Sequence, residues 1–179
     1  MERKSINFNF YSRFINGKSS FSDYRNYEII KFKIYYKFGK SLLEIIIYDS
    51  IGEKKYSSVH KEYYKKAESI ILVYDINDKN TFESCNTFIE IINKKCKRNR
   101  KKLMLIGNKS DIENKREVSE EQRLNFKFLN RCESFETSCE NKENTHVNYE
   151  NISKAFETLI KITINEIISS DFNEFKKKD

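Results

Sequence analysis

The stretch Leu103-Met104-Leu105-Ile106-Gly107-Asn108-Lys109-Ser110-Asp111 decides the fold of this chain. Its first four residues form a short, continuous apolar run, which is typical of a strand that is buried on both faces. The run ends abruptly in a polar loop. In open α/β sheets, ligands bind at the loops that follow the carboxyl ends of such strands. The sequence therefore predicts a parallel strand over 103–106, followed by a candidate ligand-binding loop over 107–111.

Strands and helices alternate along the rest of the chain. Residues 28–38 and 42–48 are rich in β-branched and aromatic residues, and Gly39-Lys40-Ser41 between them is a hairpin signal. The expected strands that remain are 69–74 and 134–138. Helices are expected over 56–67, after Asn80 as a cap, after a capping box that opens at Ser119, and over 149–168. This alternation predicts an α/β fold with a mostly parallel sheet and helices on both faces.

The N-terminal segment admits two interpretations. Ile6, Phe8 and Phe10 alternate with polar residues, as in a strand. Ile6, Phe10 and Phe14 also repeat every four residues, as in a helix, and Ser5 could cap that helix. We favour the helix.

Composition narrows the function classes. The 179 residues carry 34 Lys and Arg against 27 Asp and Glu, a net charge of +7, but the two signs are interspersed. Such a surface is typical of solvated charge, so no nucleic-acid partner is expected. The cysteines have no metal-ligand spacing and suggest reduced thiols in a cytosolic setting. They are Cys85, Cys96, Cys132 and Cys139.

Five segments, one of which is the loop over 107–111, lie in order at expected strand ends or helix starts. They are Asp49-Ser50-Ile51-Gly52, Ile70-Ile71-Leu72-Val73-Tyr74-Asp75-Ile76, Asn80-Thr81-Phe82-Glu83, Gly107-Asn108-Lys109-Ser110-Asp111 and Glu136-Thr137-Ser138-Cys139-Glu140-Asn141. In sequence and spacing they resemble the motifs of Ras-superfamily small GTPases, closest to the Rab type, over residues 13–168. The resemblance implies the P-loop GTPase-like fold. It also implies a single domain over 1–168 with a basic tail over 169–179.

The resemblance implies a guanine-binding set. In the family, the carboxylate at the position of Asp111 accepts hydrogen bonds from two guanine N–H groups, which adenine cannot offer. Asn108 would hold the loop, the stem of Lys109 would cover the base, and Ser138 would steady Asp111.

Two members of that set depart from the family pattern. Cys139 stands where the family has Ala, and its backbone N–H would meet the guanine oxygen. Glu140 stands where the family has a Lys that helps to hold the base. This reversal of charge is expected to lower affinity.

The phosphate side departs further from the family. Residues 12–19 end in Gly-Lys-Ser, but Ser12 replaces the first glycine, and Phe14 and Ile15 are bulky for a loop that curls around phosphate. The interval from Ser19 to Asp49 also looks too short for a helix, switch I and a strand. We therefore favour a register that puts the cradle on residues 1–8, which contain no glycine. The first strand would then lie before Met1 and be missing from the chain.

A missing first strand would leave the strand over 42–48 without a neighbour in the middle of the sheet. Three arrangements are open. Residues 5–11 could form a replacement strand, the sheet could close directly, or the chain could begin downstream of its real strand and cradle. We favour the third.

The residues for phosphoryl transfer are also altered. Asn26 stands where switch I carries a magnesium-binding Thr, and Glu53 stands where a Gln positions water, so no catalytic residue is assigned. Asp49 could hold magnesium through water, and the backbone of Gly52 could meet the last phosphate. Hydrolysis needs the cradle, metal and positioned water together, so we expect it to be weak or absent.

The expected function is a monomeric Rab-like guanine-nucleotide switch of vesicle traffic, with GTP or GDP and Mg²⁺ bound if binding is retained. The alternative is a pseudo-GTPase that serves as a protein-interaction module. Because the chain ends Lys176-Lys177-Lys178-Asp179 without a prenylation cysteine, we expect a cytoplasmic protein that reaches membranes only through a partner.

Overall fold

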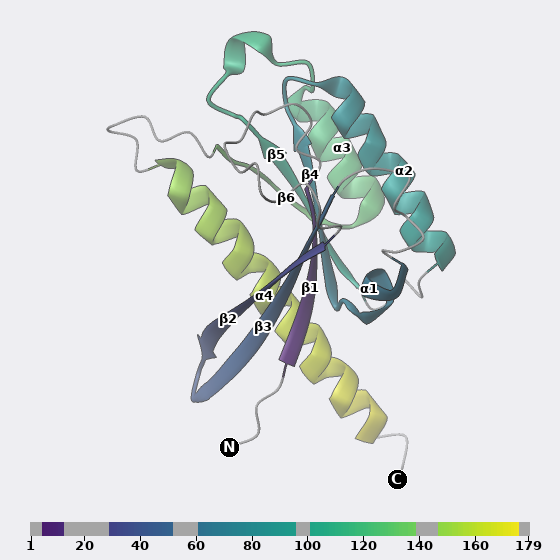
Figure 1. Ribbon diagram of the computed structural model, residues 1–179, viewed down its shortest axis with the longest axis vertical. Helices are drawn as coiled ribbons and strands as arrows, with labels where there is room; N and C mark the ends of the chain where they lie inside the picture. The colour runs from purple at the N-terminus through teal and green to yellow at the C-terminus, as the bar shows by residue number, and fades with distance from the viewer. Residues whose placement is uncertain (1–4, 13–28, 52–60, 96–100, 139–146, 176–179) are drawn as a thin grey trace.

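The computed structural model describes residues 5–12, 29–51, 61–95, 101–138 and 147–175. Within these residues, six strands form one sheet in the order β2-β3-β1-β4-β5-β6 (Figure 1). The strands are β1 (Ser5–Ser12), β2 (Ile29–Phe38), β3 (Ser41–Ile51), β4 (Ser69–Asp75), β5 (Lys102–Asn108) and β6 (Glu133–Glu136). Among the described strands, only β2 runs antiparallel to its neighbour, so the predicted α/β fold with a mostly parallel sheet is confirmed.

The N-terminal segment is a strand, so the prediction of a helix there is wrong. β1 pairs in parallel with β3, from Ser5 opposite Glu44 to Ser12 opposite Ile51, and with β4 on its other side. The central place in the sheet is therefore filled from within this chain, and the expectation of a missing first strand is corrected. Local spacing could not decide this, because the backbone groups of β3 and β4 need partners that only a strand between them supplies.

The position of β1 also changes the register of the candidate phosphate cradle. Residues 5–8 lie inside β1, so a cradle over residues 1–8 is excluded. The candidate cradle over residues 12–19 instead begins with Ser12, the last residue of the central strand. In doubly wound sheets, that is the place where the first strand meets its phosphate-binding turn. Residues 13–28, with Asn26, lie outside the described residues.

Helices cover both faces of the sheet (Figure 1). They are α1 (Lys61–Lys66), α2 (Lys79–Lys95), α3 (Glu120–Asn130) and α4 (Val147–Phe175), with a short 3-10 turn, η4 (Glu113–Lys115). One core cluster joins α2 and α3 to β4 and β5, through residues such as Phe88 and Phe126. A second joins α4 to β3, β4 and β5, through residues such as Leu159. The two clusters therefore confirm the prediction that helices pack on both faces of the sheet.

The helix and turn signals are confirmed at most positions. Gly39 has a φ of +57° in the β2–β3 hairpin, and Ser119 forms the predicted capping box with Gln122. The prediction that Asn80 caps α2 is wrong, because Asn80 lies inside the helix. The carboxylate of Asp78 accepts the backbone N–H of Asn80 at 3.0 Å. The last helix, α4, extends to Phe175, beyond the expected end at residue 168.

Candidate functional site

The loops after β5 and β6 meet at the carboxyl edge of the sheet. The backbone N–H of Thr137 donates to the carbonyl of Gly107 at 2.8 Å, and the N–H of Ser110 donates to the carbonyl of Thr137 at 3.1 Å. The two loops are thus joined by backbone bonds on either side of Asn108. This pairing continues the β5–β6 register beyond the last ladder residues.

Three side chains that the sequence singled out converge between these loops. The hydroxyl of Ser138 donates a hydrogen bond to Oδ1 of Asp111. The hydroxyl of Thr137 lies 3.5 Å from Oδ1 of Asn108, and Asn108, Thr137 and Ser138 are all buried. The arrangement therefore fixes the direction of the Asp111 carboxylate. Cys139 and Glu140 lie outside the described residues.

Lys109 makes a contact that the sequence analysis did not predict. Its backbone has a φ of 65°, in the left-handed region. Its Nζ lies 2.6 Å from Oδ2 of Asp75, the last residue of β4. Sequence reasoning quoted Asp75 within a motif but gave it no role. Asp75 could have been recognised as a site residue from its position, because it ends β4 directly beside the end of β5.

A cluster of charge supports the β6 side of the site. Both Nη atoms of Arg116 donate to the carboxylate of Glu136 at 2.8 Å, and Nε of Arg123 lies 3.6 Å from the same group. The side-chain hydrogen bond from Arg116 lowers the pKa of Glu136, and the charges of both arginines act in the same direction. Glu136 directly precedes Thr137, so this cluster anchors the loop that carries Ser138.

We expect Glu136→Gln to destabilise the protein at pH 7 by about 1.5 kcal/mol, the low end for hydrogen bonds to a charged group, because water screens these partly exposed side chains. Since the native pKa is lowered, this stabilisation is present above the ordinary glutamate pKa of about 4.3 and is lost as pH falls through the native value. Urea unfolding across pH measures it. Glu121→Gln, at an exposed position of α3, is the matched control. A difference that stays constant down to about pH 2 would contradict the assignment.

Close packing lies directly beneath the guanine-motif loop. A Cβ added to Gly107 would lie 2.8 Å from the hydroxyl of Tyr74 and 2.8 Å from Cγ2 of Ile76. Tyr74 is buried, and its hydroxyl has no hydrogen-bond partner among the described residues. Burial raises the pKa of Tyr74. The absence of a side chain at Gly107 is therefore what lets β5 pass over this ring.

Of the residues proposed to hold phosphate, metal or water on the β3 side, the structure describes only Asp49. Asp49 lies near the carboxyl end of β3, opposite Phe10 of β1 in the register. It is therefore on the same edge of the sheet as the guanine motif. Gly52 and Glu53 lie outside the described residues. Within the described parts of the chain, no group of three or more His, Cys, Asp and Glu side chains is placed to hold a metal ion.

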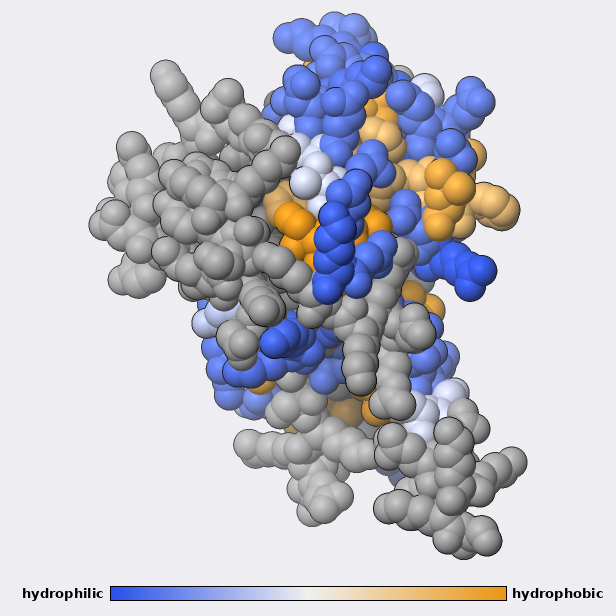
Figure 2. All heavy atoms as spheres, turned by 90° about the vertical axis from the view of Figure 1, so that its right-hand side faces the viewer, coloured by the Kyte–Doolittle hydropathy of each residue, from blue (hydrophilic) through white to orange (hydrophobic). Residues whose placement is uncertain are grey.

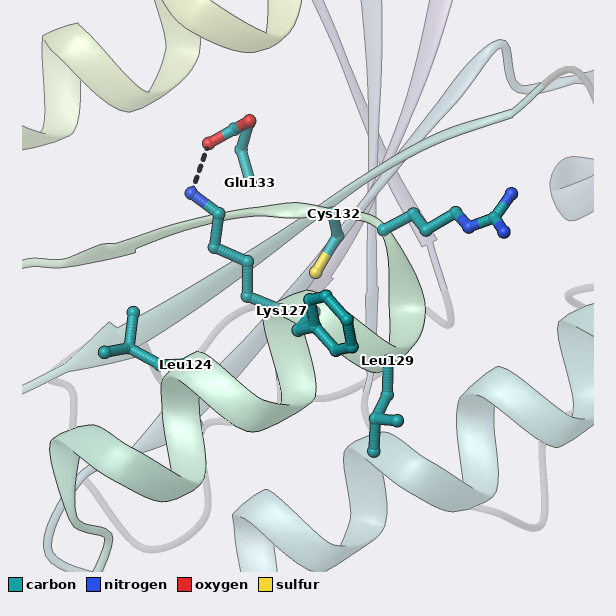
Figure 3. A pocket seen from close by; sticks show the side chains of 7 residues that line it. Leu124, Lys127, Leu129, Cys132 and Glu133 are labelled. Atoms are coloured by element: carbon teal, nitrogen blue, oxygen red, sulfur yellow. Dashed lines mark hydrogen bonds and ion pairs between the residues drawn. The ribbon is translucent and has the colours of Figure 1, made fainter.

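A separate cavity of about 760 Å³ lies at the opposite edge of the sheet, between the end of α3 and the start of β6. Lys127 and Glu133 form a 2.9 Å ion pair across it (Figure 3). Phe128 and Leu129 beside it are exposed. Figure 2 looks onto the side of the molecule where α2 and α3 lie, and it shows hydrophobic residues at the surface among hydrophilic ones. This cavity is remote from the loops that carry Asn108 and Asp111.

The strand order, the helices on both faces and the polar loops at the carboxyl edge define a doubly wound α/β protein, a class whose ligands bind beyond the carboxyl ends of the strands. The sequence profile of the Ras family matches residues 9–162, and the chain belongs to that family. The match begins inside β1, which agrees with residues 12–19 following the first strand of the family fold.

The similar proteins are Rab proteins at low identity. The chain is 38% identical over 84 residues to Ras-related protein Rab-12 of Mus musculus. The aligned segment covers 47% of this chain and 34% of Rab-12. It is 34% identical over 96 residues to Rab-13 of Rattus norvegicus, and this alignment covers 54% of the chain and 47% of Rab-13. It is also 34% identical over 100 residues to Rab-17 of Mus musculus, and this alignment covers 56% of the chain and 47% of Rab-17. The matched segments thus span a third to a half of these relatives.

Members of the Ras family typically bind GTP or GDP with Mg²⁺. No helix in the described part of the chain has the length and apolar character needed to span a bilayer.

Proposed function

We propose that this protein is a Rab-like guanine-nucleotide-binding switch of vesicle traffic. The observation that carries the proposal is the convergence of Asn108, Asp111 and Ser138 at the carboxyl edge of the sheet, with the Ser138 hydroxyl bonded to Asp111. The similarity to Rab-12, Rab-13 and Rab-17 supports the assignment to vesicle traffic.

Base recognition follows from the chemistry of the loop. One oxygen of the Asp111 carboxylate accepts from Ser138, and the group keeps acceptor capacity for the two N–H donors on one edge of guanine. Adenine has no such donor pair, so its binding would cover a partly buried carboxylate without supplying these two hydrogen bonds. The backbone N–H of Cys139 meets the guanine oxygen, and Glu140 lowers affinity relative to a family Lys.

The phosphates are held by the segment after β1. Gly17-Lys18-Ser19 supplies the small residue, the ammonium and the hydroxyl that a phosphate-binding loop uses, and it comes shortly after the end of the central strand at Ser12. Asp49 would hold Mg²⁺ through water, and the backbone of Gly52 would meet the terminal phosphate. When bound, Mg²⁺ neutralises charge on the phosphate oxygens.

Hydrolysis is slow in this proposal. Glu53 stands at the water-positioning place and adds negative charge beside a triphosphate, and Ser12 replaces the first glycine of the cradle. Phosphate release in a single turnover measures the rate. A rate equal to that of a relative with the family Gln would contradict this part of the proposal.

We expect Asp111→Ala to weaken GDP binding by about a hundredfold or more, because two hydrogen bonds to a charged group contribute about 1.5–3 kcal/mol each and 1.4 kcal/mol is a factor of ten. Fluorescent GDP titrated in the presence of Mg²⁺ measures this, with ADP for comparison. Glu121→Ala is the matched control, since it removes an exposed carboxylate that is not part of the guanine motif.

Wild-type protein that binds GDP and ADP equally, or Asp111→Ala that binds GDP like wild type, would refute guanine recognition. A folded protein that binds no nucleotide would favour a pseudo-GTPase that serves as an interaction module.

The remaining assignments complete the proposal. Residues 1–168 form a single domain that acts as a monomer in the cytoplasm, and a partner protein brings it to membranes. Its surface, with charges of both signs interspersed, is not adapted to nucleic acid.

A further inference from the structure

We propose that Asp75 is a positioning residue for the guanine base, because it holds Lys109 at both its ammonium group and its backbone. The inference rests on the proposed function, in which the stem of Lys109 covers the base. It assigns a role to the end of β4, which guanine recognition as described above does not use.

The first contact is the ion pair between Nζ of Lys109 and Oδ2 of Asp75, at 2.6 Å. The side chains are 35% and 18% exposed, so the carboxylate is the better shielded partner. A lysine side chain has four rotatable bonds, and fixing its far end fixes the course of its methylene stem. The ion pair therefore orders the part of Lys109 that lies along the base.

The second contact runs through Asn77. Oδ1 of Asp75 accepts the backbone N–H of Asn77 at 2.9 Å, and Nδ2 of Asn77 donates to the carbonyl of Lys109 at 3.3 Å. Both oxygens of the Asp75 carboxylate thus act on Lys109, one directly and one through Asn77. This link supports the left-handed backbone of Lys109, whose φ of 65° is unfavourable for a residue with a side chain.

Asp75 itself is firmly placed. Its backbone N–H donates to the hydroxyl of Thr81 at 2.9 Å, and Thr81 is buried at the start of α2. The next residue, Ile76, donates its N–H to the carbonyl of Asn108 at 3.1 Å. The end of β4 is therefore tied to α2 and to β5, and it is a rigid base for orienting Lys109.

This arrangement orders Lys109 before nucleotide arrives. A binding group that is already ordered loses less conformational entropy on binding than a free one. Loss of the Asp75 charge should therefore speed nucleotide release without changing which edge of the base Asp111 reads.

The test compares Asp75→Asn, Lys109→Met and the double variant. Asn retains an oxygen that can accept the Asn77 N–H, and Met retains an apolar stem without the charge. We expect Asp75→Asn to release fluorescent GDP about threefold to tenfold faster than wild type. In the Lys109→Met background, the same change should have no further effect. GDP and IDP should respond equally, because IDP lacks only the amino group that Asp111 reads. Glu83→Gln, which breaks the exposed Lys79–Glu83 pair on α2, is the matched control.

The outcomes separate this inference from the proposed function. Wild-type protein that binds no guanine nucleotide overturns both. Wild-type binding with an unchanged or slower release from Asp75→Asn overturns the role of Asp75 alone, and so does an equal acceleration in the Lys109→Met background. Urea unfolding of the four proteins without nucleotide adds an independent check. If the stability effects of the two substitutions simply add, there is no ion pair and the inference fails.

Discussion

Phe126→Ala is expected to lower the free energy of unfolding by about 3–5 kcal/mol, the usual cost of truncating a buried phenylalanine. Phe126 is 5% exposed and sits in the core between α2, α3 and the sheet. Its ring centroid lies 5.6 Å from that of Phe82, which in turn lies 5.0 Å from that of Tyr74. Removing the first ring therefore empties one end of an aromatic row and leaves the others with fewer contacts.

Phe128→Ala, two residues further along α3, is the matched control. Phe128 is 81% exposed, so its truncation should change stability by no more than about 0.5 kcal/mol. Both substitutions remove the same atoms from the same helix, and urea denaturation with a constant m-value measures each. Similar losses for the two variants would contradict the orientation of α3.

Gly107→Ala should destabilise the protein by up to about 3 kcal/mol, as overpacking does in a well-packed core. The added Cβ would lie 2.8 Å from Oη and 2.9 Å from Cζ of Tyr74, and 2.8 Å from Cγ2 of Ile76. Tyr74 and Ile76 are buried and cannot move away freely. Because the carbonyl of Gly107 accepts from the N–H of Thr137, a shift of β5 would also disturb the loop that carries Ser138. We therefore expect weaker GDP binding together with the loss of stability.

Tyr74→Phe provides the control for this clash. The Tyr74 hydroxyl has no hydrogen-bond partner among the described residues, so its removal alone should be neutral or slightly stabilising. In the Gly107→Ala background it removes one of the colliding atoms and should restore part of the lost stability. Thermal unfolding of the two single variants and the double variant measures the coupling. Strict additivity would show that the hydroxyl is not what limits the space at Gly107.

The apolar run that ends at Gly107 was a reliable guide because β5 is buried on both faces. A strand of this kind can be recognised from its continuous apolar run without knowing which strands lie beside it, and the same holds for β4. The capping box at Ser119 was equally readable, since both of its hydrogen bonds lie within four residues. The predicted cap of α2 at Asn80 is two residues too late. Several residues before α2 are of types that can cap a helix, and the sequence alone does not decide among them.

The N-terminal segment shows the limit of local pattern. Ile6, Phe8 and Phe10 fit a strand, and Ile6, Phe10 and Phe14 fit a helix, so spacing supported both. The strand prevails because β1 forms hydrogen bonds to β3 and β4, which are far from it in the sequence. With β1 in place, the Gly-Lys-Ser at 17–19 comes after a strand, although the short interval from Ser19 to Asp49 argues against a cradle there.

By itself, the sequence determined the class of fold and the loop that carries Asn108 and Asp111, because buried apolar runs and a polar break at a strand end are local features. Only the tertiary structure decided that β1 lies at the centre of the sheet, that Asp75 pairs with Lys109 and that Tyr74 fills the space beside Gly107. The physical reason is the same in each case. These contacts join residues from separate strands, and their geometry exists only once the backbone hydrogen bonds of the sheet have set the register.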